Sequence, residues 1–183
     1  MSTTKYFFTA DTHFLHHNII KYCKRPYANV DEMNEDLIAR WNAKVGPNDT
    51  VMHLGDVSLG HVGPTKAILS RLSGKICLIK GNHDDTALAC HSRFEWIKDV
   101  YELYIPDKKQ KIFLSHYAHR VWNKSHRGVW HLYGHSHGTL PDDPESNSFD
   151  CGVDCHGYAP LSFEEVKAIM DKKKPKAKDH HGA

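Results

Sequence analysis

The side chains in this sequence that could do chemistry fall into five short groups rich in histidine, aspartate and asparagine. In chain order the groups are Asp11-Thr12-His13, Gly55-Asp56, Gly81-Asn82-His83-Asp84, His116 and Gly134-His135-Ser136-His137. Their carboxylate oxygens, amide oxygen and imidazole nitrogens suit Mn, Fe, Zn or Ni better than a metal that prefers thiolates. Two metal ions need about this many ligands. The residue types therefore indicate a dinuclear metal centre.

Each group follows a short apolar run that is typical of a buried strand. The runs cover residues 5–9, 50–54, 75–80, 111–115 and 130–133. Strands are rigid supports, so ligands that follow them directly are held in place. The pattern predicts that the metal ligands lie in the loops just beyond five strands.

The spacing of two pairs sets a condition on these loops. Asp11 and His13 are two residues apart, as are His135 and His137. A continuing strand would point the two members of each pair to opposite faces. Each pair can converge on one ion only if the chain turns sharply after the strand, and Gly134 permits a close turn.

Helical patterns separate the early strands. Residues 30–45 predict an amphipathic helix that Asp31 can cap, 64–72 a helix with proline in its first turn, and 162–170 a helix opened by the Ser162–Glu165 capping box. The early alternation of strand and helix favours parallel pairing. The later strand-rich half, which includes 100–105 and 149–153, favours antiparallel pairing. We expect one mixed α/β domain over 1–170 and a disordered, lysine-rich tail over 171–183.

Composition is that of a globular enzyme-sized domain. The chain has 183 residues, 40% hydrophobic and 25% charged. It contains no apolar run of 18 residues, and its start has no secretory pattern. Five scattered cysteines fit reduced thiols in the cytoplasm. Without the tail, 24 − 5 = 19 basic and 22 − 2 = 20 acidic residues remain, which does not indicate a nucleic-acid binder.

The order of the five groups resembles the D-x-H, G-D, G-N-H-[DE], H and G-H-x-H signature of the calcineurin-like metallophosphoesterases. The run from Asp11 to Asn18, DTHFLHHN, is similar to a small bacterial and phage branch of that superfamily. That branch usually has glycine where this chain has Leu15. The resemblance extends to about Val166. It implies two mixed β-sheets packed face to face and flanked by helices, a four-layer α/β/β/α fold with metals at the edge where strands end.

The resemblance also implies a role for each residue of the five groups. One ion would be bound by Asp11, His13 and His137, the other by Asn82, His116 and His135, with Asp56 bridging the two. The ions would be divalent, with Mn as the first expectation and Fe, Zn, Ni or Mg as alternatives. A metal-bridging hydroxide would attack phosphorus in line. His83 would donate a proton to the leaving group, and Asp84 would hold its imidazole from behind.

The function implied is an enzyme: a two-metal-dependent phosphoester hydrolase in the cytoplasm. We favour a phosphodiesterase on small or nucleotide substrates, with a phosphomonoesterase as the alternative. A nuclease acting on DNA or RNA is less favoured, because the chain is short and its body lacks a basic surplus. A non-catalytic interaction module, like the retromer subunit that shares this fold but has lost ligands, is least favoured. We expect no membrane partner, and the oligomeric state stays open.

Several further residues have two interpretations. Arg120, Asn123 and His126 follow His116 closely and could bind substrate phosphate, or form a surface loop held by Trp122. Three later polar residues could contact substrate or order the loop of His135 and His137, and we favour the ordering role: Asn147, Asp150 and Asp154. His53 we interpret as a satisfied core histidine.

Overall fold

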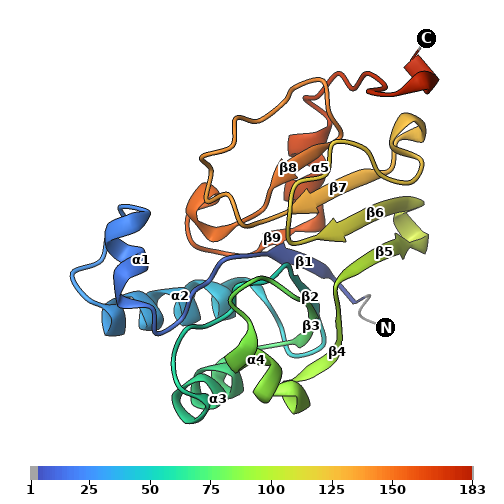
Figure 1. The fold of residues 1–183 in the computed structure, drawn as a ribbon. Helices are drawn as coiled ribbons and strands as arrows, with labels where there is room; N and C mark the ends of the chain where they lie inside the picture. Colours follow the sequence, from blue (N-terminus) through green and yellow to red (C-terminus); the bar gives the residue numbers. More distant parts are fainter. Residues whose placement is uncertain (1–3, 183) are drawn as a thin grey trace.

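The computed structural model describes residues 4–182 and contains two β-sheets (Figure 1). The first has the strand order β4-β3-β2-β1-β9 and the second β5-β6-β7-β8. The strands of the first sheet are β1 (Tyr6–Thr9), β2 (Thr50–His53), β3 (Lys75–Ile79), β4 (Phe94–Lys98) and β9 (Leu161–Ser162). Those of the second are β5 (Val100–Ile105), β6 (Gln110–Ser115), β7 (Trp130–Tyr133) and β8 (Ser148–Asp150).

Five α-helices and five 3-10 turns connect these strands. The helices are α1 (His17–Tyr22), α2 (Val30–Lys44), α3 (Val62–Arg71), α4 (Asp85–Ala89) and α5 (Phe163–Met170). The turns are η1 (His91–Arg93), η2 (Pro106–Lys108), η3 (Ser125–Arg127), η4 (Val153–Cys155) and η5 (His180–Gly182). The sequence did not predict α1, α4 or β4, whose six, five and five residues are too few to show a clear period.

Strand direction differs from the expectation in one sheet. In the first sheet, β1, β2 and β3 pair in parallel as predicted. The unpredicted β4 pairs in parallel with β3, and β9 pairs antiparallel with β1. In the second, only β5 and β6 are antiparallel, and β6–β7 and β7–β8 are parallel. The antiparallel prediction was wrong for these two pairs, because connections 116–129 and 134–147 are long enough for a crossover.

The two sheets pack face to face because alternate residues of the first sheet point to opposite sides. One set packs with α2 and α3, namely Phe7, Val51, Ile76 and Leu78. The other set faces the second sheet, namely Phe8, Met52, Leu54, Cys77 and Ile79. Their counterparts from the second sheet are Leu103, Ile105, Ile112, Leu114, Leu132 and Phe149. The molecule is therefore an α/β protein with two mixed sheets flanked by helices.

The outer face of the second sheet is covered by the loop 117–128. His119 and Trp122 from this loop pack on Phe113 and His131 of the sheet. α5 instead lies beside β9, with Phe163 stacked on the inner-face residue Trp130. The fourth, helical layer that the resemblance implied is here a loop with a single 3-10 turn.

Two helix starts show how local chemistry sets the boundaries. The Ser162–Glu165 capping box opens α5 as predicted. The cap of α2 is Asn29, whose side chain accepts the Glu32 N–H at 2.9 Å, so the prediction of Asp31 was wrong by two residues. An N-cap residue must itself be extended, and Asn29 is, whereas Asp31 already lies within the helix.

The lysine-rich segment makes contacts that differ from the disorder we expected. Lys173 is buried, and its Nζ lies 2.6 Å from Asp142. The backbone N–H groups of Lys174 and Lys176 donate to the carbonyls of Pro144 and Glu145, at 2.8 and 2.9 Å. These contacts hold the tail against the loop that follows β7. In residues 4–182, no helix has the length and apolar character needed to cross a lipid bilayer.

Candidate metal centre

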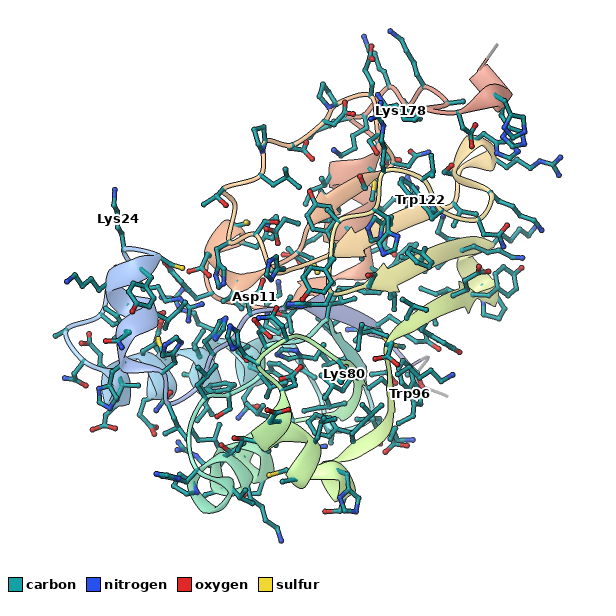
Figure 2. All side chains as sticks on the ribbon, in the orientation of Figure 1. Asp11, Lys24, Lys80, Trp96, Trp122 and Lys178 are labelled. Atoms are coloured by element: carbon teal, nitrogen blue, oxygen red, sulfur yellow. The ribbon has the colours of Figure 1, made fainter. Side chains whose placement is uncertain are left out.

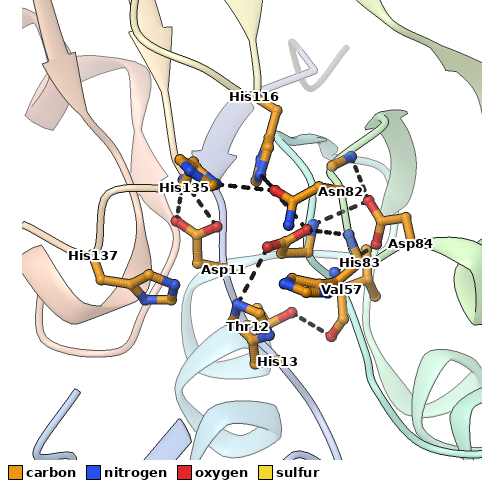
Figure 3. Close-up of polar contacts among 12 residues, drawn as sticks. Asp11, Thr12, His13, Val57, Asn82, His83, Asp84, His116, His135 and His137 are labelled. Carbon is orange, nitrogen blue, oxygen red and sulfur yellow. Dashed lines mark hydrogen bonds and ion pairs between the residues drawn. The ribbon is translucent and has the colours of Figure 1, made fainter. Parts of the chain in front are cut away.

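The five groups of candidate ligands come together at one end of the first sheet, in loops that follow β1, β2, β3, β6 and β7 (Figures 2 and 3). Five of these residues have left-handed backbones, with φ of +57° at Asp11, +47° at His13, +57° at Asp56, +67° at His135 and +47° at His137. Non-glycine residues pay roughly 1–2 kcal/mol for this conformation. The sharp turn that the paired spacings require is therefore present at both pairs.

Two glycines allow the loops to approach closely. A Cβ atom at Gly81 would lie 2.3 Å from Asp56 Oδ1. One at Gly134 would lie 2.5 Å from the Ala10 Cβ and 2.8 Å from Asp11 Oδ2. These distances leave no room for a side chain at either glycine. Gly134 thus serves close approach to the Asp11 loop, while the positive φ falls on the next residue.

One cluster consists of Asp11, His13 and His137, here called the inner triad. One potential ligand atom of each lies within 4.8 Å of the others. Asp11 and His13 are 0% and 2% exposed. Neither ring nitrogen of His13 has a hydrogen-bond partner among residues 4–182. A buried imidazole without a partner is costly, and a bound cation would supply the missing partner.

The second cluster consists of Asn82, His116 and His135, here called the outer triad. His116 Nε2 and His135 Nδ1 each lie 3.0 Å from Asn82 Oδ1. The Leu54 carbonyl lies 2.7 Å from His116 Nδ1 and can only accept, so that nitrogen carries the hydrogen of the neutral ring. The Nε2 lone pair then faces another acceptor, the Asn82 oxygen. A cation bound between them would turn this repulsion into coordination.

Asp56 lies between the two triads. Its Oδ2 is 3.4 Å from His13 Nε2, and its Oδ1 is 3.6 Å from His116 Nε2. Each carboxylate oxygen therefore faces an imidazole of a different triad. Asp56 is 2% exposed, and it has the geometry of a ligand shared by two ions.

Burial sets the protonation of the inner triad. It raises the pKa of Asp11 well above its usual range, with the Asp150 carboxylate adding to the rise and His137 opposing it. Burial, followed by the charge of His137, lowers the pKa of His13 to about 2. His13 is therefore a neutral lone-pair donor at neutral pH. Burial thus disfavours the charged form of each side chain, and a bound cation would stabilise the Asp11 carboxylate.

His83 lies beside the two triads without belonging to either. His83 is exposed, and its ring centroid lies 5.9 Å from that of His13. Its backbone N–H donates to Asp56 Oδ1 at 2.9 Å, which fixes it beside the shared residue.

Asp84 does not hold the His83 ring. Its Oδ1 accepts the Val57 N–H at 2.8 Å, and its Oδ2 accepts the N–H groups of Gly81 and Asp56 at 2.7 and 3.0 Å. These three bonds use the buried carboxylate to tie the loop after β2 to the loop after β3. The expectation that Asp84 supports the His83 imidazole is corrected accordingly.

The structure does not bring Arg120, Asn123 and His126 to the triads. Arg120 and His126 line a surface hollow with Lys178. The Asn123 side chain donates to Glu102 at 3.1 Å, and the His126 ring stacks on the tail. Figure 2 shows Trp122 and Lys178 over the second sheet, away from Asp11. The surface-loop interpretation therefore fits these three residues better than the phosphate-binding one.

The ordering role favoured for Asp150 and Asp154 is confirmed. Asp154 Oδ2 lies 2.7 Å from His137 Nδ1, and Asp150 Oδ2 accepts the Gly138 N–H at 3.0 Å. His53 is satisfied at one nitrogen, with Nε2 3.0 Å from the Thr12 hydroxyl. The residue that sequence reasoning missed is Arg25. Arg25-Pro26 is part of the resemblance to the small bacterial and phage branch, but no local pattern gave Arg25 a role.

These features define a two-sheet α/β protein with a cluster of aspartate, asparagine and histidine ligands at one sheet edge. No family model matches the chain. An uncharacterized protein of Methanocaldococcus jannaschii, MJ1445, is 35% identical over 181 residues, which cover 95% of this chain and 96% of that protein. The chain therefore belongs to the same family as MJ1445.

Two further proteins are similar to this chain over more than nine tenths of its length. The gene 66 protein of Mycobacterium phage L5 is 27% identical over an alignment 201 residues long, which covers 93% of this chain and 95% of that protein. The crystal structure of AQ665, a protein of unknown function from Aquifex aeolicus, superimposes with a TM-score of 0.71 at 21% identity. It covers 91% of this chain and 100% of that one. This last similarity concerns the fold alone.

Proposed function

We propose that this protein is a calcineurin-like metallophosphoesterase, a two-metal-dependent phosphoester hydrolase that prefers small or nucleotide diesters. The observation that carries the proposal is the position of Asp56. Its two carboxylate oxygens face His13 and His116, which belong to separate triads, at 3.4 and 3.6 Å. A carboxylate that serves two ligand sets at once is what a pair of ions requires.

The residues fit two divalent ions on other grounds as well. His13 has no other partner among the described residues, and His116 turns a lone pair toward the Asn82 oxygen. Asp11, His13 and His137 would bind one ion, and Asn82, His116 and His135 the other, with Asp56 shared. Ions bound there would supply positive charge for the phosphoryl oxygens and acidify water. Manganese is the first expectation for this ligand set.

His83 is the residue that we assign to proton transfer. Its ring is exposed, so substrate can reach it, and its backbone is held by the shared Asp56 at 2.9 Å. An imidazole fixed beside the phosphoryl position can donate a proton to the leaving oxygen.

A diester is favoured over a monoester on charge. A monoester carries an additional negative charge that an arginine or lysine usually neutralises. Arg120 lies away from the triads, and Arg25 is fully engaged by Asp154 and two backbone carbonyls. The open side of the site offers exposed, neutral groups instead, namely Asn82 and His135.

The test is to prepare the protein without added metal, count bound ions by elemental analysis, and measure hydrolysis with Mn²⁺ added. We expect up to two ions per chain and faster cleavage of a bis-aryl phosphate than of a mono-aryl phosphate. Faster monoester cleavage would shift the assignment to a phosphomonoesterase. A protein that takes up no ion under these conditions would overturn the proposal.

A further inference from the structure

Arg25 is a buried arginine that contacts the Asp11 loop directly and is linked to His137 through Asp154. Its side chain is 0% exposed. It donates from Nη2 to the Asp11 carbonyl at 2.7 Å and from Nη1 to the Thr12 carbonyl at 2.9 Å. It also forks onto Asp154, from Nε to Oδ1 and from Nη2 to Oδ2, both at 2.8 Å. One guanidinium therefore makes four short hydrogen bonds around the site.

The two sides of this fork belong to different sheets. Asp11 and Thr12 follow β1 of the first sheet, and Asp154 lies in η4, after β8 of the second. Asp154 in turn contacts His137 Nδ1 through Oδ2 at 2.7 Å. The chain of contacts runs from the carbonyls of the Asp11 loop, through Arg25 and Asp154, to the His137 ring.

The Asp154 contact also decides which nitrogen of His137 is available. A carboxylate accepts, so Nδ1 carries the hydrogen that it donates to Asp154. Nε2 is then the nitrogen left to bind an ion. A carboxylate that fixes a ligand histidine in this way also raises its basicity. The outer triad has no such ionic support among residues 4–182, since His116 relies on the Leu54 carbonyl.

We propose that Arg25 and Asp154 form a positioning pair that sets the affinity of the inner triad for its metal ion. This inference rests on the proposed function and extends it by assigning different supports to the two ion sites. Arg25 acts through Asp11 and His137 and touches no reacting atom. Lysine at this position keeps the charge but cannot make the planar fork, so it cannot hold all four acceptors at once.

The experiment measures Co²⁺ binding by calorimetry and by visible absorption, in two backgrounds that isolate the two sites. His135→Ala removes an outer ligand, and His13→Ala removes an inner one. In the His135→Ala background, Arg25→Lys is expected to weaken Co²⁺ binding 10–100-fold and to change the cobalt absorption spectrum. In the His13→Ala background, the same substitution is expected to change the affinity less than about threefold.

Arg93 provides a matched control. It is another arginine that binds backbone carbonyls, with Nε 2.9 Å from Leu69 O and Nη2 2.8 Å from Leu72 O, but it lies beside α3 and away from the triads. Arg93→Lys is expected to lower thermal stability as Arg25→Lys does, yet to leave both cobalt affinities unchanged. Asp154→Asn in the His135→Ala background is expected to reproduce the loss seen with Arg25→Lys.

The outcomes separate the two proposals. If the unmodified protein binds two ions and Arg25→Lys weakens both sites equally, or neither, the positioning role is wrong while the proposed function stands. If Arg93→Lys lowers cobalt affinity as much as Arg25→Lys, the effect is general destabilisation and the inference is also wrong. If the unmodified protein binds no Co²⁺, both proposals fail.

Discussion

The inner and outer triads lie side by side around Asp56 but differ in exposure and in support. In the inner triad, Asp11 and His13 are almost completely buried, and His137 is fixed by the Asp154 carboxylate, whose side chain is 5% exposed. In the outer triad, Asn82 and His135 are exposed, and His116 is fixed by a backbone carbonyl. Figure 3 shows the two sets meeting at one end of the sheet.

This difference suggests a division of work. Buried ligands held by an ion pair are preorganised, so an ion bound there loses little by reorganisation and exchanges slowly. Exposed ligands on a loop give solvent and substrate access. We therefore expect the inner triad to hold the tighter ion and the outer triad to face the incoming phosphoester.

The largest expected effect comes from removing the residue that the triads share. Asp56→Asn keeps the side-chain shape but loses the charge of the two oxygens that face His13 and His116. We expect loss of at least one ion and a fall in turnover of about 1,000-fold or more, because both ions act on the phosphoryl group. The measurements are elemental analysis and bis-aryl phosphate hydrolysis.

Asp49→Asn is the matched control for this change. Asp49 also accepts backbone N–H groups, from Lys5 and Gly46, but it lies at the other end of β2. It should retain both ions and most of the turnover. An Asp56→Asn protein that kept two ions at full affinity would remove the basis for calling Asp56 shared.

The next effect separates chemistry from ion binding. His83→Ala should leave both triads loaded while turnover falls about 100- to 1,000-fold, because only the proton donor is lost. The loss should be smaller for substrates whose leaving group is already a good one. Elemental analysis that found metal missing from this variant would contradict the assigned role.

A third effect concerns pH and differs between the triads. Burial alone would lower the pKa of His137, but Asp154, Cys23 and Asp11 together outweigh burial and raise the pKa to about 10. Burial, followed by the charge of His116, lowers the pKa of His135. Below pH 10, an ion entering the inner triad must therefore displace a proton from His137, whereas His135 at neutral pH has none to lose.

The direction of the pH dependence of ion affinity follows from these two pKa shifts. Inner affinity should fall roughly tenfold per pH unit for each displaced proton as pH decreases, while outer affinity should change less. Calorimetry of Co²⁺ binding in buffers of different ionisation enthalpy, with the His135→Ala and His13→Ala proteins, counts the protons released at each site. Equal proton release at the two sites would contradict the expected difference in protonation between the inner and outer triads.

The smallest effect tests whether the functional surface extends beyond the two triads. Within the described residues 172–182, Lys173 packs on the loop after β7 through Asp142, away from the ligands. Deletion of residues 172–183 should change hydrolysis of a small diester less than about twofold. A large loss of DNA cleavage on the same deletion, with small-diester hydrolysis intact, would instead favour the nuclease interpretation.

The ligands could be predicted from sequence because each one follows its strand directly. Asp11, Asp56 and His135 stand two or three residues beyond β1, β2 and β7, and the fold brings those strand ends together. The loop turns were predictable too, since a pleated strand cannot bring Asp11 and His13 to one ion.

The supports could not be predicted, because their partners are far apart in sequence. Arg25 and Asp154 are separated by 129 residues in the sequence, and Asp56 and Asp84 by 28 residues. Local spacing carries no information about such pairs. Strand direction in the second sheet failed for a related reason, since the loops 116–129 and 134–147 look the same for a hairpin and for a crossover.

The order of these residues along the chain also bears on how the protein is made. Asp11 and His13 leave the ribosome first, but His137 follows more than 100 residues later, and Asp154 and the β9 strand that pairs with β1 later still. A nascent chain shorter than this holds two orphan ligands and an open sheet edge. If the protein binds the proposed ions, cation capture at the inner triad would therefore wait until Asp154 and β9 have been synthesised.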